Sequence, residues 1–266
     1  MSAPCLLALD AATSVVHVGL QAEGRVRTLA LPSGAAASTG LLPALQALMR
    51  EAGLGWPALD AIAFGRGPGA FTGLRTAAAV AQGLALGTDR PVIAIDTLLA
   101  VAEDARDLFS QGASAEGHAA AAPVEPGRTA AGLQAPALFW ALTDARMGEV
   151  YAASWRLTAE GWQPGQPPAL WQPQTLAAEL AAAAAGGTPL VAAGNALLAH
   201  AEAFGDLPVQ VVRLPDAQPR GAALLRLAGC DWAAGRAVDA ALALPLYVRD
   251  KVAETTAERA ARAAAA

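Results

Sequence analysis

Hydrophobic and polar positions in the first hundred residues follow two different periods. Five short apolar runs predict β-strands, and they cover 5–10, 15–21, 25–31, 61–64 and 91–95. Apolar residues recur at three- and four-residue spacing over 38–53, 72–86 and 98–108, which predicts amphipathic helices. Three strands are thus followed by helix, strand, helix, strand and helix. This order predicts an α/β fold with helices packed on a mixed sheet.

The opening pattern returns in the second half of the chain. Residues 139–144 again form an apolar run that ends in an aspartate, and 150–155 again predict a strand. Aligning Asp10 with Asp144 places His17 on Tyr151, which indicates a structural duplication. The remaining predicted elements are a helix at 175–185, a strand at 190–193, a helix from 196, a strand at 209–212 and a helix at 221–234.

Composition divides the chain into lobes and tails. Residues 111–136 lack periodicity and consist mainly of Gly, Ala, Ser and Pro, which is typical of a loop or linker. We therefore predict an N-terminal lobe at 1–108 and a low-complexity loop at 109–136. A C-terminal lobe follows at 137–250, with its last helix packing back, and then a frayed tail at 251–266.

The overall balance of charge and apolar residues narrows the class of function. Hydrophobic residues make up 55% of 266, enough for a large core, and the formal net charge is −5 with a single lysine. A chain that binds nucleic acid on its own is expected to be basic, so autonomous binding of nucleic acid is not expected. Cys5 and Cys230 match no metal or redox spacing. With no basic leader and no long apolar stretch, we expect a cytoplasmic protein without membrane association.

The glycine-rich segment IAFGRGPGAFTGLR at 62–75 raises the question of nucleotide binding. It lacks the lysine of the phosphate-binding pattern GxxxxGK[ST]. Gly65, Gly67 and Ala70 satisfy a relaxed dinucleotide pattern, with Asp96 where a ribose-binding acid could stand. However, Pro68 removes one backbone N–H from the cradle. The alternative is a tight turn that joins a strand to a helix.

Several motifs together resemble the TsaB (YeaZ) family. GRGPGAFTGLR, followed by AQGLALG and PVIAIDTL, is similar to the family signature. LALDAATS at 7–14, TDARMGEVYAA at 143–153 and PLYVRDKVA at 245–253 resemble its other landmarks, in the same order. The resemblance implies an actin-like ATPase (ASKHA, ribonuclease-H-like) fold. Such a fold has two related lobes, each with a mixed β-sheet and flanking helices.

The resemblance also implies a function. It is that of a non-catalytic subunit that binds TsaD, in the complex that transfers threonylcarbamoyl to N6 of the adenosine beside the tRNA anticodon. The implied partners are TsaD in a heterodimer and TsaE with ATP in a larger complex, with a homodimer when alone and tRNA reached only through the complex. No cofactor of its own and no metal are expected, and ATP or ADP is placed at the partner interface. The chain's own histidines agree, since His17, His118 and His200 lie at no ligand spacing and the HxxxH pair of TsaD is missing.

The residues expected to matter fall into two groups. In the TsaB family the first two helices pack against the matching pair of TsaD, so leucines on one and a low ridge on the other are predicted to bind the partner. These are Leu41, Leu45, Leu48, Met49, Gly73, Ala77 and Ala81. The alternative is that both faces cover the chain's own sheet. The family motifs also contain residues without an assigned role: Asp10, Gly67, Gly69, Thr72, Arg75, Asp144, Arg146, Glu149, Tyr247 and Arg249.

Two of these motifs carry open alternatives. Asp144, Arg146 and Glu149 fit a hairpin turn with a local arginine–carboxylate pair, or a functional contact of Arg146. Asp10 and Asp144 stand at strand ends where kinases of this superfamily hold magnesium and phosphate. An autonomous ATP-dependent small-molecule kinase is therefore the alternative function, although AAGNALLA at 192–199 is only a faint second glycine loop.

Overall fold

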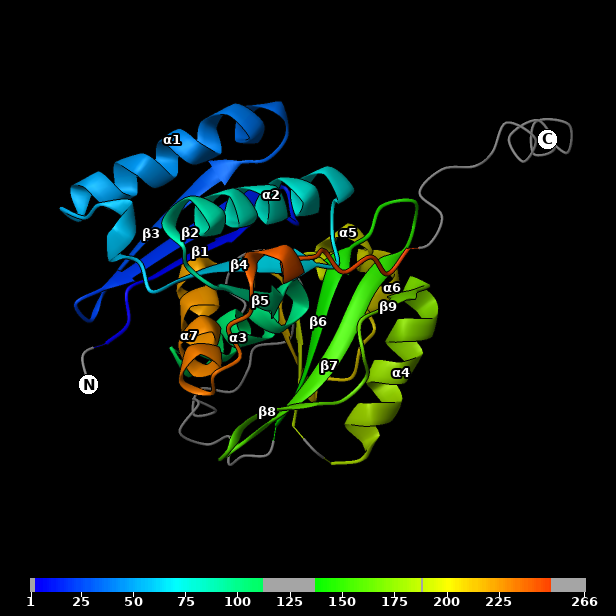
Figure 1. The fold of residues 1–266 in the computed structure, drawn as a ribbon. Coiled ribbons are helices and arrows are strands. Elements are labelled where there is room, and N and C mark those ends of the chain that lie inside the picture. Colours follow the sequence, from blue (N-terminus) through cyan, green and yellow to red (C-terminus); the bar gives the residue numbers. More distant parts are fainter. Residues whose placement is uncertain (1–2, 112–136, 188, 250–266) are drawn as a thin grey trace, which may run out of the picture.

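The computed structural model describes residues 3–111, 137–187 and 189–249, and it contains two β-sheets with helices between and around them (Figure 1). The first sheet has the order β3-β2-β1-β4-β5. Its strands are β1 (Leu6–Asp10), β2 (Val15–Ala22), β3 (Arg25–Pro32), β4 (Ala61–Gly67) and β5 (Val92–Asp96). β1 pairs with β2 antiparallel and with β4 parallel, so the sheet is mixed as the sequence predicted.

The second sheet repeats this arrangement. Its order is β11-β10-β6-β7-β8, with β9 (Ala169–Trp171) paired to β7. The strands are β6 (Ala137–Asp144), β7 (Val150–Thr158), β8 (Gly161–Pro164), β10 (Leu190–Ala193) and β11 (Val211–Leu214). Read in reverse, the order is that of the first sheet, which confirms the duplication. His17 faces Asp10, whereas Val150 rather than Tyr151 faces Asp144, because the second hairpin is one residue shorter.

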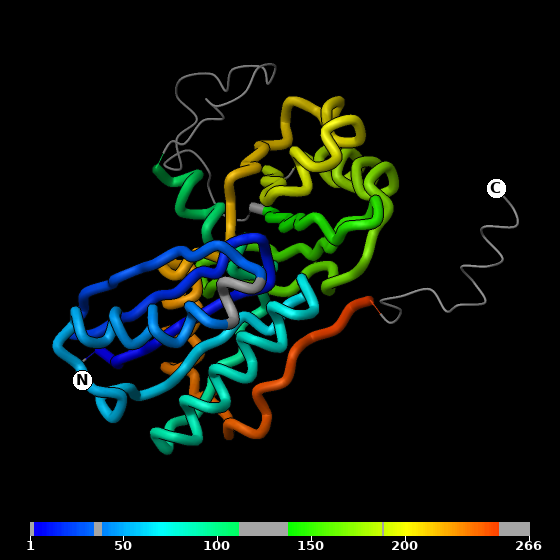
Figure 2. The backbone as a smooth tube through the Cα atoms, turned by 90° about the horizontal axis from the view of Figure 1, so that it is seen from above, coloured from blue at the N-terminus to red at the C-terminus, as the bar shows by residue number. Residues whose placement is uncertain are grey.

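Two long helices cover the outer face of the first sheet, α1 (Ala35–Glu51) and α2 (Phe71–Thr88) (Figures 1 and 2). α1 begins at Ala35 rather than near Ser38, and Pro43 stands inside the helix. Its end agrees with the prediction, because Gly53 takes a left-handed φ of 71° just after it. Side chains from alternate positions of the strands, including Leu7 and Leu9, face these helices.

Two further helices, α3 (Thr97–Ser110) and α7 (Gly221–Ala233), pack where the two sheets meet. α7 lies on the first sheet although it follows the second in sequence, and its Leu224 packs with Leu6. α3 contributes Val101 to the core of the second sheet and Ala100 to that of the first. The lobes are therefore joined by a shared core as well as by the chain.

The far face of the second sheet is covered by α4 (Pro173–Ala185), α5 (Ala196–Ala199) and α6 (Ala201–Phe204). Short 3₁₀ turns occur at Trp56–Ala58 and Ala240–Leu242. Strands β8 and β9 were not predicted, because four and three residues are too short to show a periodic pattern.

After α7 the chain returns to the first lobe in a segment that we call the C-terminal strap, residues 236–249. Val238 bridges Val92 at the edge of the first sheet, and Ala240 and Ala243 enter the core under α2. The Leu246 N–H then donates a 2.7 Å hydrogen bond to the Arg66 carbonyl. Figure 2 shows the strap, in orange and red, running beside α2 toward the second lobe.

The predicted low-complexity loop and tail lie outside the described residues, apart from residues 109–111, so the division into 1–108, 109–136, 137–250 and 251–266 stays a prediction. Among the helices that the structure describes, none is both long and apolar enough to cross a membrane.

Candidate functional site

A cleft of about 720 Å³ lies between the two lobes. The first lobe lines it with the β1–β2 turn and the glycine loop at 68–71. The second lobe contributes residues 143–146 and Asn195, and the strap residues 246–249 complete the wall. The cleft therefore collects most of the family motifs that the sequence pointed to.

Asp10 ends β1 next to this cleft but is completely buried. Its Oδ2 accepts a 2.6 Å hydrogen bond from the Thr97 hydroxyl, and its Oδ1 accepts one of 2.7 Å from the Ala12 N–H. Burial raises the pKa of Asp10 to about 6, against the lowering effect of these two hydrogen bonds. Both oxygens are thus engaged by the protein, and the carboxylate does not line the cleft.

Two glycines of the loop explain why this network is so compact. A Cβ at Gly65 would overlap the Asp10 carboxylate, so only glycine lets β4 pass so close to β1. Gly67 takes a φ of 109° and donates its N–H to Thr97 Oγ1 at 3.1 Å. The loop is a strand-to-helix turn, as the simpler alternative predicted. Asp96, the candidate ribose acid, forms a 2.6 Å ion pair with Arg66 instead.

Other members of the glycine loop line the cleft or reach its mouth. Gly69 lies against Ala12 and lines the cleft, whereas Thr72 is exposed in the first turn of α2. Arg75 stacks on the Phe71 ring, 3.8 Å from its centroid, and donates to the Tyr247 hydroxyl at 3.2 Å. These side chains join the start of α2 to the strap.

The β6–β7 turn faces this cluster from the second lobe. Arg146 and Met147 both adopt left-handed conformations, with φ of 62° and 57°. The Asp144 carboxylate accepts from the Arg146 N–H at 3.0 Å, and His200 Nε2 lies 3.3 Å from the same oxygen. The local arginine–carboxylate pair is confirmed at 3.5 Å between Arg146 Nη1 and Asp144 Oδ2, but the Arg146 side chain is 81% exposed.

Glu149 has a different partner, which the sequence alone did not indicate. Arg249 of the strap forms an ion pair with Glu149 at 2.5 Å, and it also donates to the Arg146 carbonyl at 3.4 Å. This pair holds the end of the strap to the second lobe across the mouth of the cleft. Tyr151 lies beside it, and burial raises the pKa of its phenol.

The cleft also contains polar groups that sequence reasoning missed. Thr143 lines it and is buried, yet its hydroxyl has no hydrogen-bond partner among the described residues. Asn195 accepts from the Asp144 N–H at 3.0 Å through its side-chain oxygen. The signal for Asn195 was the faint glycine loop at 192–199, and the signal for Thr97 was its position directly after a strand-ending aspartate. The cleft can therefore form hydrogen bonds with a polar ligand, although the buried carboxylate of Asp10 does not line it.

The predicted partner-binding residues require a correction. Most of them are buried in the core between α1, α2 and the first sheet, and these are Leu41, Leu45, Leu48, Met49, Ala77 and Ala81. Gly73 faces the backbone of Ala11. The low ridge lets α2 approach its own sheet and is not an outward surface, because a helix rich in alanine has small residues on every face and the pattern does not distinguish them.

The outward faces of the two helices carry a different set of residues. On α1, Leu42 is 44% exposed, and on α2, Leu86 is 74% exposed. Between Thr72 and Leu86 the exposed residues of α2 are Arg75, Ala79 and Gly83, and a Cβ at Gly83 would meet no neighbouring atom. The exposed positions of α2 from Ala79 to Leu86 are therefore nonpolar.

Metal ligation has no visible basis in the described part of the chain, where no group of three His, Cys, Asp or Glu side chains comes together. His17 contacts Gln218 at 3.0 Å and His200 contacts Asp144, while His118 lies outside the described residues. Burial lowers the pKa of His17.

Comparison with known proteins gives consistent matches. A family model for TsaD, tRNA N6-adenosine threonylcarbamoyltransferase, matches residues 32–112, which hold α1, α2 and α3. The TsaB proteins of Haemophilus influenzae and Escherichia coli are 43% identical over 103 residues and 32% identical over 170 residues. The matched segments span 39% and 64% of this chain, and only 44% and 63% of those relatives.

A solved structure matches over nearly its full length. YeaZ from Pseudomonas aeruginosa is 34% identical, with a TM-score of 0.72, over 92% of this chain and 99% of that one. The match covers both lobes and the topology described above, which is the actin-like ATPase fold that the motifs implied.

Proposed function

The chain belongs to the TsaB (YeaZ) family, and we propose that it serves tRNA threonylcarbamoyladenosine biosynthesis in the cytoplasm as a non-catalytic subunit that binds TsaD. The observation that carries this proposal is the match to the P. aeruginosa structure over both lobes. The H. influenzae and E. coli relatives are tRNA threonylcarbamoyladenosine biosynthesis proteins, and they indicate the pathway.

The state of Asp10 supports a non-catalytic role. A kinase of this superfamily needs a carboxylate at this strand end for magnesium and phosphate, but Thr97 and Ala12 engage both Asp10 oxygens. Releasing the carboxylate would break a buried network that also holds Gly67. The alternative of an autonomous small-molecule kinase is therefore not favoured.

The surface that we propose for TsaD is the outer face of α1 and α2. Exposed leucines at 42 and 86 supply apolar area, and the small residues at 79 and 83 allow a partner helix to approach closely. A second copy of the chain could cover the same face when TsaD is absent, which would give a homodimer. The two helices are those that the sequence predicted to bind the partner, but the proposed contacts are made by their outward-facing residues.

The proposal also covers the positions of the nucleotide and of the other partners in the complex. We place ATP or ADP at the interface with TsaD, with TsaE in the larger complex and tRNA held mainly by the other subunits. The charge of the chain supports the last point, since 23 acidic residues outnumber 18 basic ones.

Reconstitution tests the proposal directly. The purified chain is mixed with its cognate TsaD and the other pathway components, and threonylcarbamoyladenosine in tRNA is measured by mass spectrometry. We expect modification that depends on the chain, together with ATP turnover near background when the chain is alone. Modification that proceeds equally without it, or robust turnover with a small acceptor, would overturn the proposal.

A further inference from the structure

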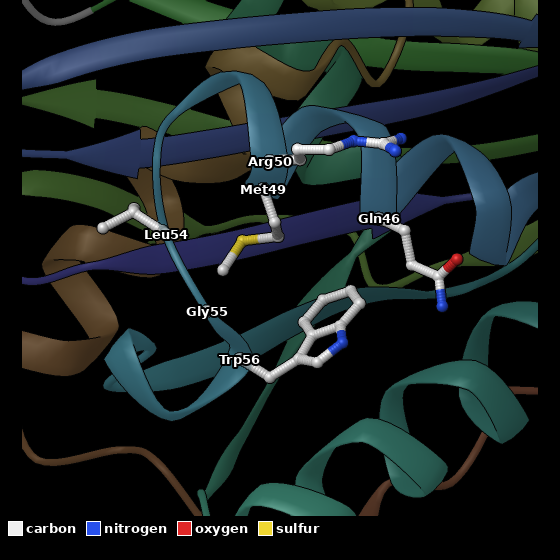
Figure 3. A pocket seen from close by; sticks show the side chains of 6 residues that line it. All are labelled: Gln46, Met49, Arg50, Leu54, Gly55 and Trp56. Carbon is white, nitrogen blue, oxygen red and sulfur yellow. The ribbon is translucent and has the colours of Figure 1, made fainter.

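A second hollow, of about 320 Å³, lies at the C-terminal end of α1 (Figure 3). Two consecutive segments form it, the last turns of α1 and the loop that follows. Its residues are Gln46, Met49, Arg50, Leu54, Gly55 and Trp56. Figure 3 shows Met49 and Gln46 extending from the helix on either side of the Trp56 indole ring, with Arg50 along the helix above them. We call this hollow the α1 slot.

The slot combines an apolar floor with unpaired donors at its rim. Met49 is buried, and Trp56 packs against the core of the first lobe. Arg50 is exposed and forms no ion pair with any residue that the structure describes. The Trp56 indole N–H and the Gln46 amide likewise make no hydrogen bond within the described ranges. Guanidinium and indole can only donate, so the rim favours an acceptor that carries negative charge.

The loop that carries Trp56 is held in place before any partner arrives. The Leu54 N–H donates to the Met49 carbonyl at 3.0 Å, and Leu59 N–H donates to the Trp56 carbonyl at 3.1 Å. Arg90, just after α2, donates to the Pro57 carbonyl at 2.9 Å. A preformed slot avoids the entropy loss of ordering a loop on binding.

We propose that the α1 slot receives one apolar side chain, flanked by a carboxylate, from the protein that docks on the outer face of α1 and α2. The inference rests on the proposed function and specifies the chemistry of its interface. Leu42, Gln46 and Arg50 stand four residues apart on the exposed side of α1, so the slot continues the proposed TsaD surface. Its volume suits one large side chain, and Arg50 offers the complementary charge. Pockets of this kind, with tryptophan and arginine, are where interface energy concentrates.

A purely structural role for these residues makes a different prediction. Arg50 lies in the last turn of α1, where a cation interacts favourably with the helix dipole, and Trp56 could act only as a cover for the core. In that case a partner would be insensitive to both, provided that the fold survives.

Titration calorimetry of the full chain with TsaD separates the two roles. Arg50→Glu and Trp56→Ala are each expected to raise the Kd about tenfold or more. Arg25→Glu is the matched control, because Arg25 is exposed, has no ion pair in the described structure and lies outside the slot on β3. Trp56→Phe keeps the apolar floor and is expected to bind more tightly than Trp56→Ala. Circular dichroism melting establishes that each variant is folded.

The possible results are distinct. If the wild-type chain binds TsaD and the Arg50 and Trp56 variants bind within about twofold of it, the slot is not used and the proposed function stands. A control Arg25→Glu that weakens binding as strongly as Arg50→Glu would also overturn the slot, since the effect would then be general electrostatics. If the wild-type chain does not bind TsaD, the proposed function fails first.

Discussion

The hydroxyl of Thr97 donates a 2.6 Å hydrogen bond to the carboxylate of Asp10, across a separation of 87 residues in the chain. The same hydroxyl accepts from the Gly67 N–H, so one threonine at the start of α3 joins β1 and β4. The bond holds the superfamily's strand-end aspartate inside the protein and away from the cleft.

Stability is expected to depend on pH through Asp10. Its pKa is about 6 in the folded chain, against an ordinary value of about 3.9, so the folded state binds more protons between these values. Asp10 therefore stabilises the folded state fully at pH values below the lower pKa. As the pH rises through the higher pKa, the free energy of unfolding is expected to fall by about 3 kcal/mol. Asp10→Asn should remove this fall, as measured by urea unfolding from pH 4 to pH 7, roughly the window of the two values.

Other titrating groups also contribute to the pH dependence of stability. Burial also raises the pKa of Asp104, and this contribution remains in the Asp10 variant. The informative quantity is therefore the difference between the two pH profiles. Parallel profiles would show that Asp10 does not titrate in this range.

Gly65 and Gly83 are expected to respond oppositely to alanine. Gly65→Ala places a methyl group on the Asp10 carboxylate and should reduce the free energy of unfolding by about 3 kcal/mol. Gly83 lies in α2 with open space around it, so Gly83→Ala should stabilise the chain by up to about 1 kcal/mol through helix propensity. Urea unfolding of both variants tests the pair, and equal effects would mean that the β1–β4 approach is looser than described.

The strap should depend on the pair formed by Arg249 and Glu149. Their side chains are 13% and 26% exposed, so Arg249→Ala is expected to destabilise the chain by about 1 to 3 kcal/mol. A double-mutant cycle with Glu149→Gln measures the coupling between them. Arg146→Ala serves as the control, because that side chain is 81% exposed and should change stability by less than about 0.5 kcal/mol. No coupling between the first two would mean that the strap is held by its apolar contacts alone.

Alanines on opposite faces of α2 should separate folding from partner binding. Ala77 is buried, so Ala77→Glu is expected to unfold the protein. Ala79 faces outward, so Ala79→Glu should leave the fold intact and abolish TsaD binding in a pull-down with purified proteins. Ala178→Glu, on the exposed side of α4, is the matched control and should bind normally. A folded Ala79 variant with normal affinity would place the interface elsewhere.

The isolated chain is expected to bind tRNA only weakly. Acidic residues exceed basic ones, and phosphate binding draws most of its affinity from lysine and arginine. Filter binding at physiological salt should show no sub-micromolar affinity for the chain alone and a large gain after TsaD is added. Tight binding by the chain alone would contradict the assignment of tRNA to the other subunits.

Local patterns in the sequence were sufficient for most of the elements. Strand β10 was predicted to the residue, and α2 within two residues at each end, because apolar periodicity and turn residues act over short distances. The repeated run ending in Asp10 and Asp144 revealed the duplication, and the family motifs indicated the fold. The sequence also favoured a turn for the glycine loop, because Pro68 and the absence of a phosphate-binding lysine are features of that segment alone.

Contacts between distant segments decided the rest. Whether Ala77 or Ala79 of α2 faces the sheet could not be read from a helix with small residues all around it. The burial of Asp10 depends on Thr97, and the partner of Glu149 stands 100 residues away at Arg249. These outcomes follow from how the sheets and helices pack. Burial and charge pairing are properties of the three-dimensional neighbourhood, so the sequence determined the elements, while the tertiary structure determined which of their faces are available for function.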